Sequence, residues 1–324
     1  MTSAPGQQLA LTPAQHRLCA RIARLYYESE LTQEQIGEVL GLSRMKVNRL
    51  LRLAREAGVV EIKVTGPEEP FGDLQHALLT MFRLQDVRIV PSPPDADGLR
   101  GVLAEGAARW LEEQLHDGLV VGIGLGRTVA ELPETFAPDT RVGCVFITVE
   151  GVGTSPHAEF AAYDVASRLA TKAGGVVEVI SAPTFVSDPV MRDQLLAEPS
   201  IASSLDVARG AGLVIQSVGT ISSDATLYRH GTLAEDDLAR LRSAGAVGDA
   251  LGHFFDEHGE PVPWPTDETH IGLTLDDLRQ LKTSVVLAGG EEKAPIMRAA
   301  IRGGYFNVVV TDEDTARRLV EMGP

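Results

Sequence analysis

The sequence is poor in cysteine and in long apolar runs, and each scarcity excludes a class of protein. Only Cys19 and Cys144 occur in 324 residues, and their wide separation fits neither a disulfide framework nor a metal-ligand spacing. We expect both to be buried, reduced thiols of a cytoplasmic protein. No apolar stretch reaches about 18 residues without a polar or charged break, so we expect no membrane span. Residues 1–8 also lack the pattern of a secretory signal.

Positive charge is scarce as well, yet it is concentrated in one place. Lys and Arg number 29 against 45 Asp and Glu, which gives a net charge of −16, and DNA phosphate repels an acidic surface. Residues 43–55 nevertheless contain five basic side chains and no acidic one. This segment carries +5, so the remainder of the chain carries −21. A local basic face can bind DNA while the acidic remainder limits non-specific association.

Length and composition predict more than one folded unit. A chain of 324 residues exceeds one ordinary domain, and its 44 % of hydrophobic residues is enough for sizeable cores. The polar, proline-containing residues 65–70 are typical of a linker. We therefore predict an N-terminal helix-turn-helix domain over residues 1–64 and a larger α/β domain over residues 71–324.

The N-terminal segment contains the start and stop signals of three helices. Residues 12–15 and 32–35 each combine a threonine with a glutamine three positions later, which is the pattern of a capping box. Gly41 ends the second helix, Ser43 caps the third after a short turn, and apolar residues recur at helical spacing. Residues 59–64 then alternate like a strand, which we interpret as part of a wing. A short helix, a glycine turn and a longer basic helix predict a helix-turn-helix.

The third predicted helix is the one expected to enter the major groove of DNA. Its first turns face base edges, where arginine can bind guanine with two hydrogen bonds, while lysine and serine more often hold phosphate. A single arginine is more often only a solvated side chain, but here five basic residues coincide with two capping boxes. Gln33, at the start of the preceding helix, is placed near backbone phosphate. The predicted DNA-binding residues are Gln33, Ser43, Arg44, Lys46, Val47, Asn48, Arg49 and Arg52.

Residues 32–44 resemble the helix-turn-helix of the SorC/DeoR type of bacterial sugar-operon regulators. They read Thr-Gln-Glu-Gln-Ile-Gly-Glu-Val-Leu-Gly-Leu-Ser-Arg, and the family motif usually reads T-Q-x-x-I-A-x-x-L-G-hydrophobic-S-R. Gly37 stands where alanine is common, and we expect it to loosen the second helix by about 1 kcal/mol at most. The resemblance implies a transcriptional regulator that binds double-stranded operator DNA.

The C-terminal segment alternates apolar runs with helical patterns. Such alternation predicts a parallel α/β sheet with helices on both faces, and ligands bind such sheets beyond the carboxyl ends of the strands. The predicted strands span residues 87–90, 119–123, 142–149, 176–180, 213–218, 284–288 and 307–311. The predicted helices span residues 70–83, 97–116, 157–172, 234–244, 275–281, 293–302 and 312–322.

Glycine-containing turns that follow these strands are candidate ligand sites. After residues 119–123, the turn 124–128 offers backbone amides and the Thr128 hydroxyl to a phosphate. The third glycine of a dinucleotide fingerprint is absent, and a glycine turn between a strand and a helix is common in any case. A turn residue or a surface lysine is an equally good explanation of the remaining candidates. These candidates are Glu150, Gly151, Asp249 and Lys293.

The order of these turns resembles the sugar-binding domain of the same family. The matching segments include residues 124–128, 248–256, 288–293 and 302–313, so with the N-terminal motif the match covers nearly all of the chain. The resemblance implies a fold similar to sugar-phosphate isomerases and CoA-transferases, and an effector that is a phosphorylated sugar or a related metabolite. It also implies that the effector pocket is lined by Gly124, Gly126, Arg127, Thr128, Asp249 and Lys293.

Two departures from the family pattern concern the ligand. Gly124 and Leu125 stand where the family loop often carries serine and tryptophan. Glu150 stands where some relatives carry a lysine that can form a Schiff base with an aldehyde. A carboxylate cannot do that chemistry, so we predict that no covalent adduct forms at Glu150. An acid beside a phosphate site is also consistent with a less charged ligand.

These observations predict an effector-controlled transcription factor without enzymatic activity, cofactor or metal. We expect a homodimer or homotetramer, because paired half-sites need paired recognition helices. One alternative is a sugar-phosphate isomerase or transferase fused to a DNA-binding domain, in which Asp249, Glu150 and His157 serve as acids and bases. Another is a DNA-binding protein whose C-terminal domain only oligomerises.

Overall fold

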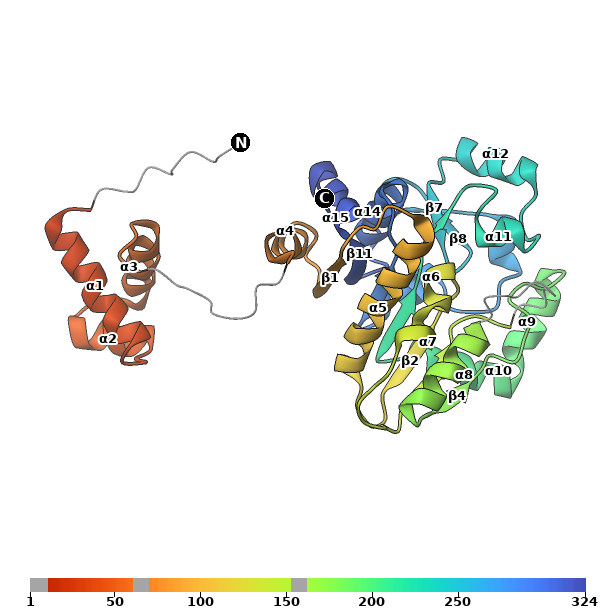
Figure 1. Ribbon diagram of the computed structural model, residues 1–324, viewed down its shortest axis with the longest axis horizontal. Helices are drawn as coiled ribbons and strands as arrows, with labels where there is room; N and C mark the ends of the chain where they lie inside the picture. The colour runs from red at the N-terminus through yellow and green to blue at the C-terminus, as the bar shows by residue number, and fades with distance from the viewer. Residues whose placement is uncertain (1–10, 61–69, 153–161) are drawn as a thin grey trace. The chain divides into compact units, whose positions relative to one another are not determined.

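The computed structural model describes residues 11–60, 70–152 and 162–324. The chain forms two compact units, residues 1–68 and 69–324, which are red to orange and orange to blue in Figure 1. Most of the predicted wing strand and of the predicted linker lies outside the described residues, as does the start of the helix predicted over 157–172. The domain limits given by the sequence therefore stay a prediction.

Three capped helices form the first unit. They are α1 (Pro13–Tyr27), α2 (Gln33–Leu40) and α3 (Arg44–Glu56). Each begins after a threonine or serine whose hydroxyl accepts a hydrogen bond from the backbone N–H three residues later. Gly41 ends α2 with a φ of +64°, a left-handed conformation that glycine adopts without strain. These local signals are the ones that the sequence displays.

The core of the first unit is a single small cluster. α3 packs against both α1 and α2. Each helix contributes the apolar residues that recur every three or four positions, so each presents one apolar stripe. The basic side chains of α3 lie off this stripe and remain exposed. The buried residues of the cluster are Cys19, Ile22, Ile36, Val47, Leu50, Leu51 and Ala54.

A seven-stranded sheet forms the centre of the second unit, and every strand pairing in it is parallel. All seven strands that the sequence predicted belong to this sheet, which confirms the parallel α/β class. From one edge to the other the strands are β1 (Asp86–Val90), β11 (Val308–Asp312), β10 (Ser284–Leu287), β5 (Leu213–Gln216), β2 (Val120–Ile123), β3 (Val145–Thr148) and β4 (Val176–Glu178).

Successive residues of the strands face two separate cores, one on each side of the sheet. On β5, Val214 belongs to one core, while Leu213 and Ile215 belong to the other. The first core is covered by α4 (Gly72–Phe82), α10 (Pro199–Arg209), α13 (Leu275–Gln280), α14 (Ala294–Arg302) and α15 (Glu313–Met322). The second is covered by α5 (Ala96–Gln114), α6 (Arg127–Ala130), α7 (Leu132–Thr135) and α8 (Ala162–Ala173), which Figure 1 shows together.

A smaller antiparallel sheet was not predicted from the sequence. Its strands are only two or three residues long, which is too short to show a period. In order they are β6 (Gly219–Thr220), β7 (Gly248–Ala250), β8 (His253–Phe255) and β9 (Pro261–Val262). The other elements are α9 (Pro189–Ala197), α11 (Thr226–Arg229), α12 (Glu235–Ser243), η1 (Pro265–Glu268) and η2 (Glu291–Lys293). Figure 1 shows α11 and α12 beside β7 and β8.

Both cysteines are buried and free, as the sequence predicted. Cys19 lies in the core of the first unit, and Cys144 lies in the core beneath α5 and α8. Burial raises the pKa of both thiols. In the part of the chain that the structure describes, no helix combines the length and the apolar character that a membrane span requires.

The chain leaves the central strands β2 and β5 in opposite directions. From β2 it continues to β3, on the side away from β5, and from β5 it reaches β10, on the side away from β2. Such a point of reversal leaves a crevice at the carboxyl ends of the strands, because the two loops diverge. A ligand site is therefore expected between the loops that follow β2 and β5.

Gly37 of α2 has a packing role that helix propensity does not reveal. A Cβ atom at this position would lie 2.6 Å from the carbonyl oxygen of Leu42, in the turn between α2 and α3. The backbone of the turn approaches α2 so closely because Gly37 has no side chain. The sequence predicted only that Gly37 loosens α2, and the structure adds that its missing side chain permits the tight turn.

We predict that Gly37→Ala lowers the free energy of unfolding by about 1 kcal/mol, because the clash with a backbone carbonyl outweighs the better helix propensity of alanine. Urea denaturation of the full chain, followed by helical circular dichroism, measures the change. Glu38→Ala, on the exposed side of the same helix, is the control and should shift stability by less than about 0.5 kcal/mol. A Gly37→Ala variant that is more stable than the parent would contradict this account.

Candidate functional site

The exposed side of α3 carries the basic residues predicted to bind DNA. Ser43 caps the helix and accepts a hydrogen bond of 3.3 Å from the backbone N–H of Lys46. Gln33, the first residue of α2, is half-buried. An exposed helix face with basic side chains and no acid before Glu56 attracts phosphate. The exposed predicted residues of α3 are Arg44, Lys46, Asn48, Arg49 and Arg52.

Two apolar residues of α3 differ from the expectation. Val47 is 0 % exposed and packs in the core of the first unit, so its side chain cannot reach a base edge, contrary to the prediction that it binds DNA. Met45 is 85 % exposed in the first turn of the helix and was not among the residues predicted to bind DNA. The sequence indicated this exposure, because Met45 does not fall at the helical spacing of the buried residues of α3. An exposed apolar side chain at this position suits contact with the methyl group of thymine.

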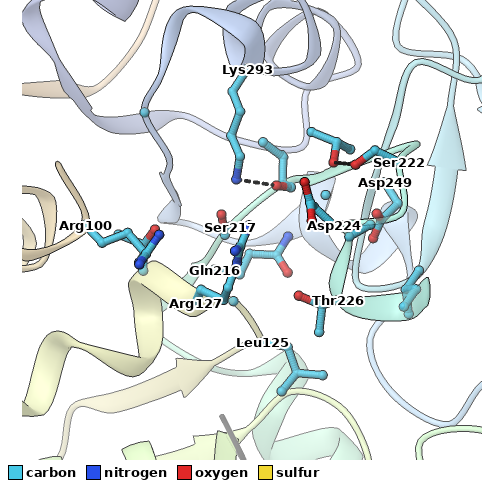
Figure 2. Close-up of a pocket in the computed structure, with 18 of the residues that line it drawn as sticks. Arg100, Leu125, Arg127, Gln216, Ser217, Ser222, Asp224, Thr226, Asp249 and Lys293 are labelled. Carbon is cyan, nitrogen blue, oxygen red and sulfur yellow. Dashed lines mark hydrogen bonds between the residues drawn. The ribbon is translucent and has the colours of Figure 1, made fainter. Parts of the chain in front are cut away.

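A cavity of about 270 Å³ lies at the carboxyl ends of the central strands of the large sheet (Figure 2). Its walls come from the residues that follow β2, β3, β5 and β10, from β7 and from the first turns of α5. This is the position at which the chain reverses direction between β2 and β5. A cavity of this size suits a small metabolite.

The cavity brings together six of the eight residues predicted to bind the effector. The other two, Gly124 and Gly151, are buried behind its wall, where their N–H groups donate to the carbonyl oxygens of Ile215 and Ile271, each at 2.9 Å. These two amides are therefore not available to an anion. The six predicted residues in the wall are Gly126, Arg127, Thr128, Glu150, Asp249 and Lys293.

Cationic side chains gather on one side of the cavity. Figure 2 shows Arg100, Arg127 and Lys293 in its left and upper parts. The Nζ atom of Lys293 donates a hydrogen bond of 3.1 Å to the carbonyl oxygen of Val218. Burial and the charge of the neighbouring Arg127 lower the pKa of Lys293. Arg127 has no hydrogen bond or ion pair with any residue that the structure describes, so the N–H groups of its guanidinium can donate to an anionic ligand.

Glycines make room for Asp249 on the other side of the cavity. Asp249 of β7 pairs with Gly219 of β6, and a Cβ atom at Gly219 would lie 1.9 Å from Asp249 Oδ1. The N–H of Gly252 donates to Asp249 Oδ2 over 3.2 Å. Burial raises the pKa of Asp249 to about 6, although this hydrogen bond and the charge of Lys293 act in the opposite direction. The carboxyl group can accept hydrogen bonds from ligand hydroxyls.

Glu150 is a second buried acid beside Asp249. An antiparallel bridge to Gly272 holds its backbone, and the residue is 3 % exposed. Burial, and next the charge of Asp249, raise the pKa of Glu150 to about 8, so it holds a proton at neutral pH. Its side chain makes no hydrogen bond with any described residue. The acid therefore faces the cavity without a protein partner.

The segment after β5 is the part of the cavity that the sequence analysis missed. Gln216 is 1 % exposed, and its Nε2 atom has no hydrogen-bond partner among the described residues. Ser217 lies against Gly126, where a Cβ atom would be 2.7 Å from the serine Cβ. The signal was present, because Gln216 and Ser217 are polar residues near the end of the predicted strand 213–218 and a glycine, Gly219, follows it. Arg100 gave no such signal, since it lies on α5, away from any strand end.

Comparison with known protein families finds a match for each unit. Residues 69–321 match the family described as "Putative sugar-binding domain", which is most of the chain. Residues 20–57 match the family described as "Sigma-70, region 4", and this range includes α2 and α3.

Similar proteins extend over almost the whole chain. The deoxyribonucleoside regulator of Bacillus subtilis (strain 168) is 30 % identical over 305 residues, which is 94 % of this chain and 97 % of that protein. The transcriptional regulator LsrR of Enterobacter sp. (strain 638) is 34 % identical over 320 residues, which is 97 % of this chain and 95 % of that protein.

Solved structures share the fold. The full-length sorbitol operon regulator SorC from Klebsiella pneumoniae has a TM-score of 0.71 at 23 % identity and covers 95 % of this chain and 99 % of that one. A domain from Vibrio fischeri, described as the "Putative Sugar-Binding Domain of Transcriptional Repressor", has a TM-score of 0.72 at 27 % identity, and the match covers 78 % of this chain and 98 % of that one. The predicted fold, a helix-turn-helix region joined to an α/β effector domain, is confirmed.

Glu150 makes the stability of the chain depend on pH. Its pKa rises from 4.5 to about 8 on folding, so the folded state holds one more proton than the unfolded state between these values. The contribution of this group to stability is therefore fully present below pH 4.5 and is lost as the pH rises through about 8. The slope approaches about 1.4 kcal/mol per pH unit.

We predict that Glu150→Gln removes this slope, because glutamine is never charged. The free energy of unfolding of the variant, relative to the parent, should rise between about pH 5 and pH 8 and level off above. Urea denaturation in a series of buffers measures both chains. Glu291→Gln, at an exposed position, is the matched control and should show no such trend. A difference that is constant with pH would show that Glu150 is ionised in the folded chain at neutral pH.

Proposed function

Because the chain belongs to the SorC/DeoR-type family of bacterial transcriptional regulators, we propose that it controls a carbohydrate operon through a sugar or sugar-phosphate effector. One observation carries the proposal: the first unit exposes a basic helix, whereas the second encloses a polar cavity. The relatives named for deoxyribonucleosides and for the sorbitol operon support a carbohydrate ligand. The site of action is the cytoplasm, where operator DNA lies.

The first unit supplies the DNA contacts. Arg44 is the residue proposed to read a guanine, which its exposure in the first turn of α3 supports, and Arg49 lies further along the same helix. Lys46 and Ser43, which caps α3, are suited to contact phosphate oxygens of DNA. Gln33, at the start of α2, is suited to contact the DNA backbone. Asn48 and Arg52 extend the same exposed face toward the carboxyl end of the helix.

The cavity supplies the effector contacts. An anionic group fits beside Arg127, Lys293 and the Thr128 hydroxyl, since two cations and a donor meet there. Asp249 and Glu150 on the wall offer hydrogen-bond acceptors to the rest of the ligand. Glu150 has no amine with which to form a Schiff base, so the effector binds without a covalent bond at this position.

Effector binding must favour one arrangement of the DNA-binding helices over another, because only differential affinity shifts an equilibrium. Lys293 is a candidate for the first step, since its Nζ atom bonds to Val218 and joins the segments after β10 and β5. An anionic ligand competes for that ammonium group. We propose that the chain acts as a homodimer or homotetramer, which presents two recognition helices to paired half-sites.

The regulator function needs only binding, whereas an isomerase needs a positioned acid and base. Glu150 and Asp249 lie in the cavity wall, but His157, the third group considered, lies outside the described residues. The relatives are named as regulators, which supports regulation as the function of this chain.

We predict that Arg44→Ala weakens specific operator binding by about 1–3 kcal/mol, because the variant loses a base contact in the major groove. Fluorescence anisotropy with an operator selected from random DNA measures the effect, and scrambled DNA of equal length is the reference. Arg83→Ala, exposed on the second unit, is the control and should bind both DNAs as the parent does. Equal losses on both DNAs would show that Arg44 holds phosphate and reads no base.

We predict that Lys293→Ala loses the effector response but keeps operator affinity within about threefold, because the lysine lies in the cavity and not in the first unit. Titration of the operator complex with a panel of sugars and sugar phosphates measures the response. Lys282→Ala, an exposed lysine outside the cavity, is the matched control. An unchanged titration for Lys293→Ala would remove this residue from the effector site.

A further inference from the structure

The cavity has two chemically different sides. Arg127 and Lys293 lie on one side, with Arg100 near them, while Asp224 and Asp249 lie on the opposite side in the view of Figure 2. Gln216 and Ser217 lie between the two groups in that view. Glu292, which precedes Lys293 in the chain, also lines the cavity and partly offsets the charge on this side. A ligand that fills this space therefore meets mainly positive charge at one end and carboxyl groups at the other.

The cavity wall buries two carboxyl groups, Glu150 and Asp249, and a lysine of the cavity lowers the pKa of only one of them. Glu150 and Asp249 are both buried, and the negative charge of Asp249 raises the pKa of Glu150. The positive charge of Lys293 lowers the pKa of Asp249, but the ammonium group of this lysine already donates a hydrogen bond to the carbonyl oxygen of Val218. No cation of the described chain pairs with Glu150. The chain thus buries a carboxyl group in a ligand cavity without supplying its counter-ion.

A ligand that offers only hydroxyl groups to these acids supplies no counter-ion for them. A hydroxyl can donate one hydrogen bond to a carboxylate, but it brings no positive charge, so one of the two acids must stay protonated. A protonated amine brings three donors and one positive charge, and it can bond to both carboxylates at once. Two buried acids that line one cavity and repel each other therefore match an ammonium group better than a hydroxyl.

We propose that the effector is an amino sugar phosphate, with its ammonium group beside Glu150 and Asp249 and its phosphate beside Arg127 and Lys293. The proposal rests on the proposed function, since it concerns the same cavity, and it narrows the ligand class. It assigns Glu150 as the residue that selects an amine over a hydroxyl.

A second observation points to a ligand in the same space. Gln216, which is 1 % exposed, lines the cavity, and its Nε2 atom has no partner among the described residues. A buried amide without an acceptor is costly, and a bound ligand removes that cost when it offers an oxygen. A hydroxyl or ring oxygen of a sugar, between the two ends of the ligand, is such an acceptor.

The proton balance of binding follows from the same contact. The pKa of Glu150 is about 8 in the free protein, so the acid is protonated at pH 7. An ammonium group favours the ionised carboxylate, and the proton of Glu150 is then released to the buffer. A ligand with a hydroxyl at that position leaves the proton on Glu150. Amine binding should therefore release about one proton more than hydroxyl binding.

Calorimetric titration of the full chain at pH 7 tests the proposal with matched pairs of compounds. Glucosamine 6-phosphate is compared with glucose 6-phosphate, and galactosamine 6-phosphate with galactose 6-phosphate, which differ only at the second carbon. In at least one pair we expect the amine to bind about tenfold tighter or more. Repeating the titrations in buffers of different ionisation enthalpy measures the released protons.

The variants separate the role of Glu150 from a general loss of binding. Glu150→Gln keeps the shape of the protonated acid, so it should fold, and we expect the amine and the hydroxyl compound to bind within about twofold of each other. The extra proton release should also disappear. Glu291→Gln, exposed and outside the cavity wall, should keep the preference of the parent. Inorganic phosphate should bind equally to the parent and to Glu150→Gln.

Three results would overturn the proposal. If the hydroxyl compound of each pair binds as tightly as the amine, the ligand is a neutral sugar phosphate and the proposed regulator function stands. If the amine preference survives in Glu150→Gln, Glu150 does not select the amine. If no compound binds and none changes operator affinity, the amino sugar assignment and the sugar-phosphate effector both fail.

Discussion

The divergence of the chain after β2 and β5 is the constraint on which the ligand cavity depends. These strands are neighbours and parallel, so their carboxyl ends lie together, yet the segments that follow them lead to opposite halves of the sheet. β7 contributes Asp249 to the wall of the space between those segments, where the carboxyl group lies against the backbone of Gly219. Glu150 follows β3, the next strand along, and completes the acidic wall. Residues distant in sequence thereby share one cavity.

The elements that could be predicted from the sequence are those with a strong local signal. Buried parallel strands appear as continuous apolar runs, and all seven were found, while the helices of the first unit were found through their caps. The strands β6 to β9 were missed because two or three residues show no period. Val47 was predicted to bind DNA, but it falls at the helical spacing of the buried residues of α3 and packs in the core.

The cavity was predicted only in part, for a physical reason. A turn after a strand can be recognised from its glycines, but the sequence does not say which amides the sheet itself uses. Gly124 and Gly151 are bonded to neighbouring backbone and so lie behind the wall. In the sequence, Gln216 looks like any polar residue at the end of a strand. Only the three-dimensional structure reveals that its Nε2 atom has no hydrogen-bond partner among the described residues. Arg100 reaches the cavity from a helix, which no strand-based rule includes.

The two cysteines provide a natural reporter for communication between the two units. Cys19 lies in the core of the first and Cys144 in a core of the second, and burial disfavours the thiolate at both. A thiol reagent can react at either position only when the surrounding core opens, so the rate at each cysteine follows the local opening of its own unit. If Cys19 is labelled more slowly after a ligand fills the cavity, ligand binding in the second unit has reduced the local opening of the first. No engineered label is needed for this measurement.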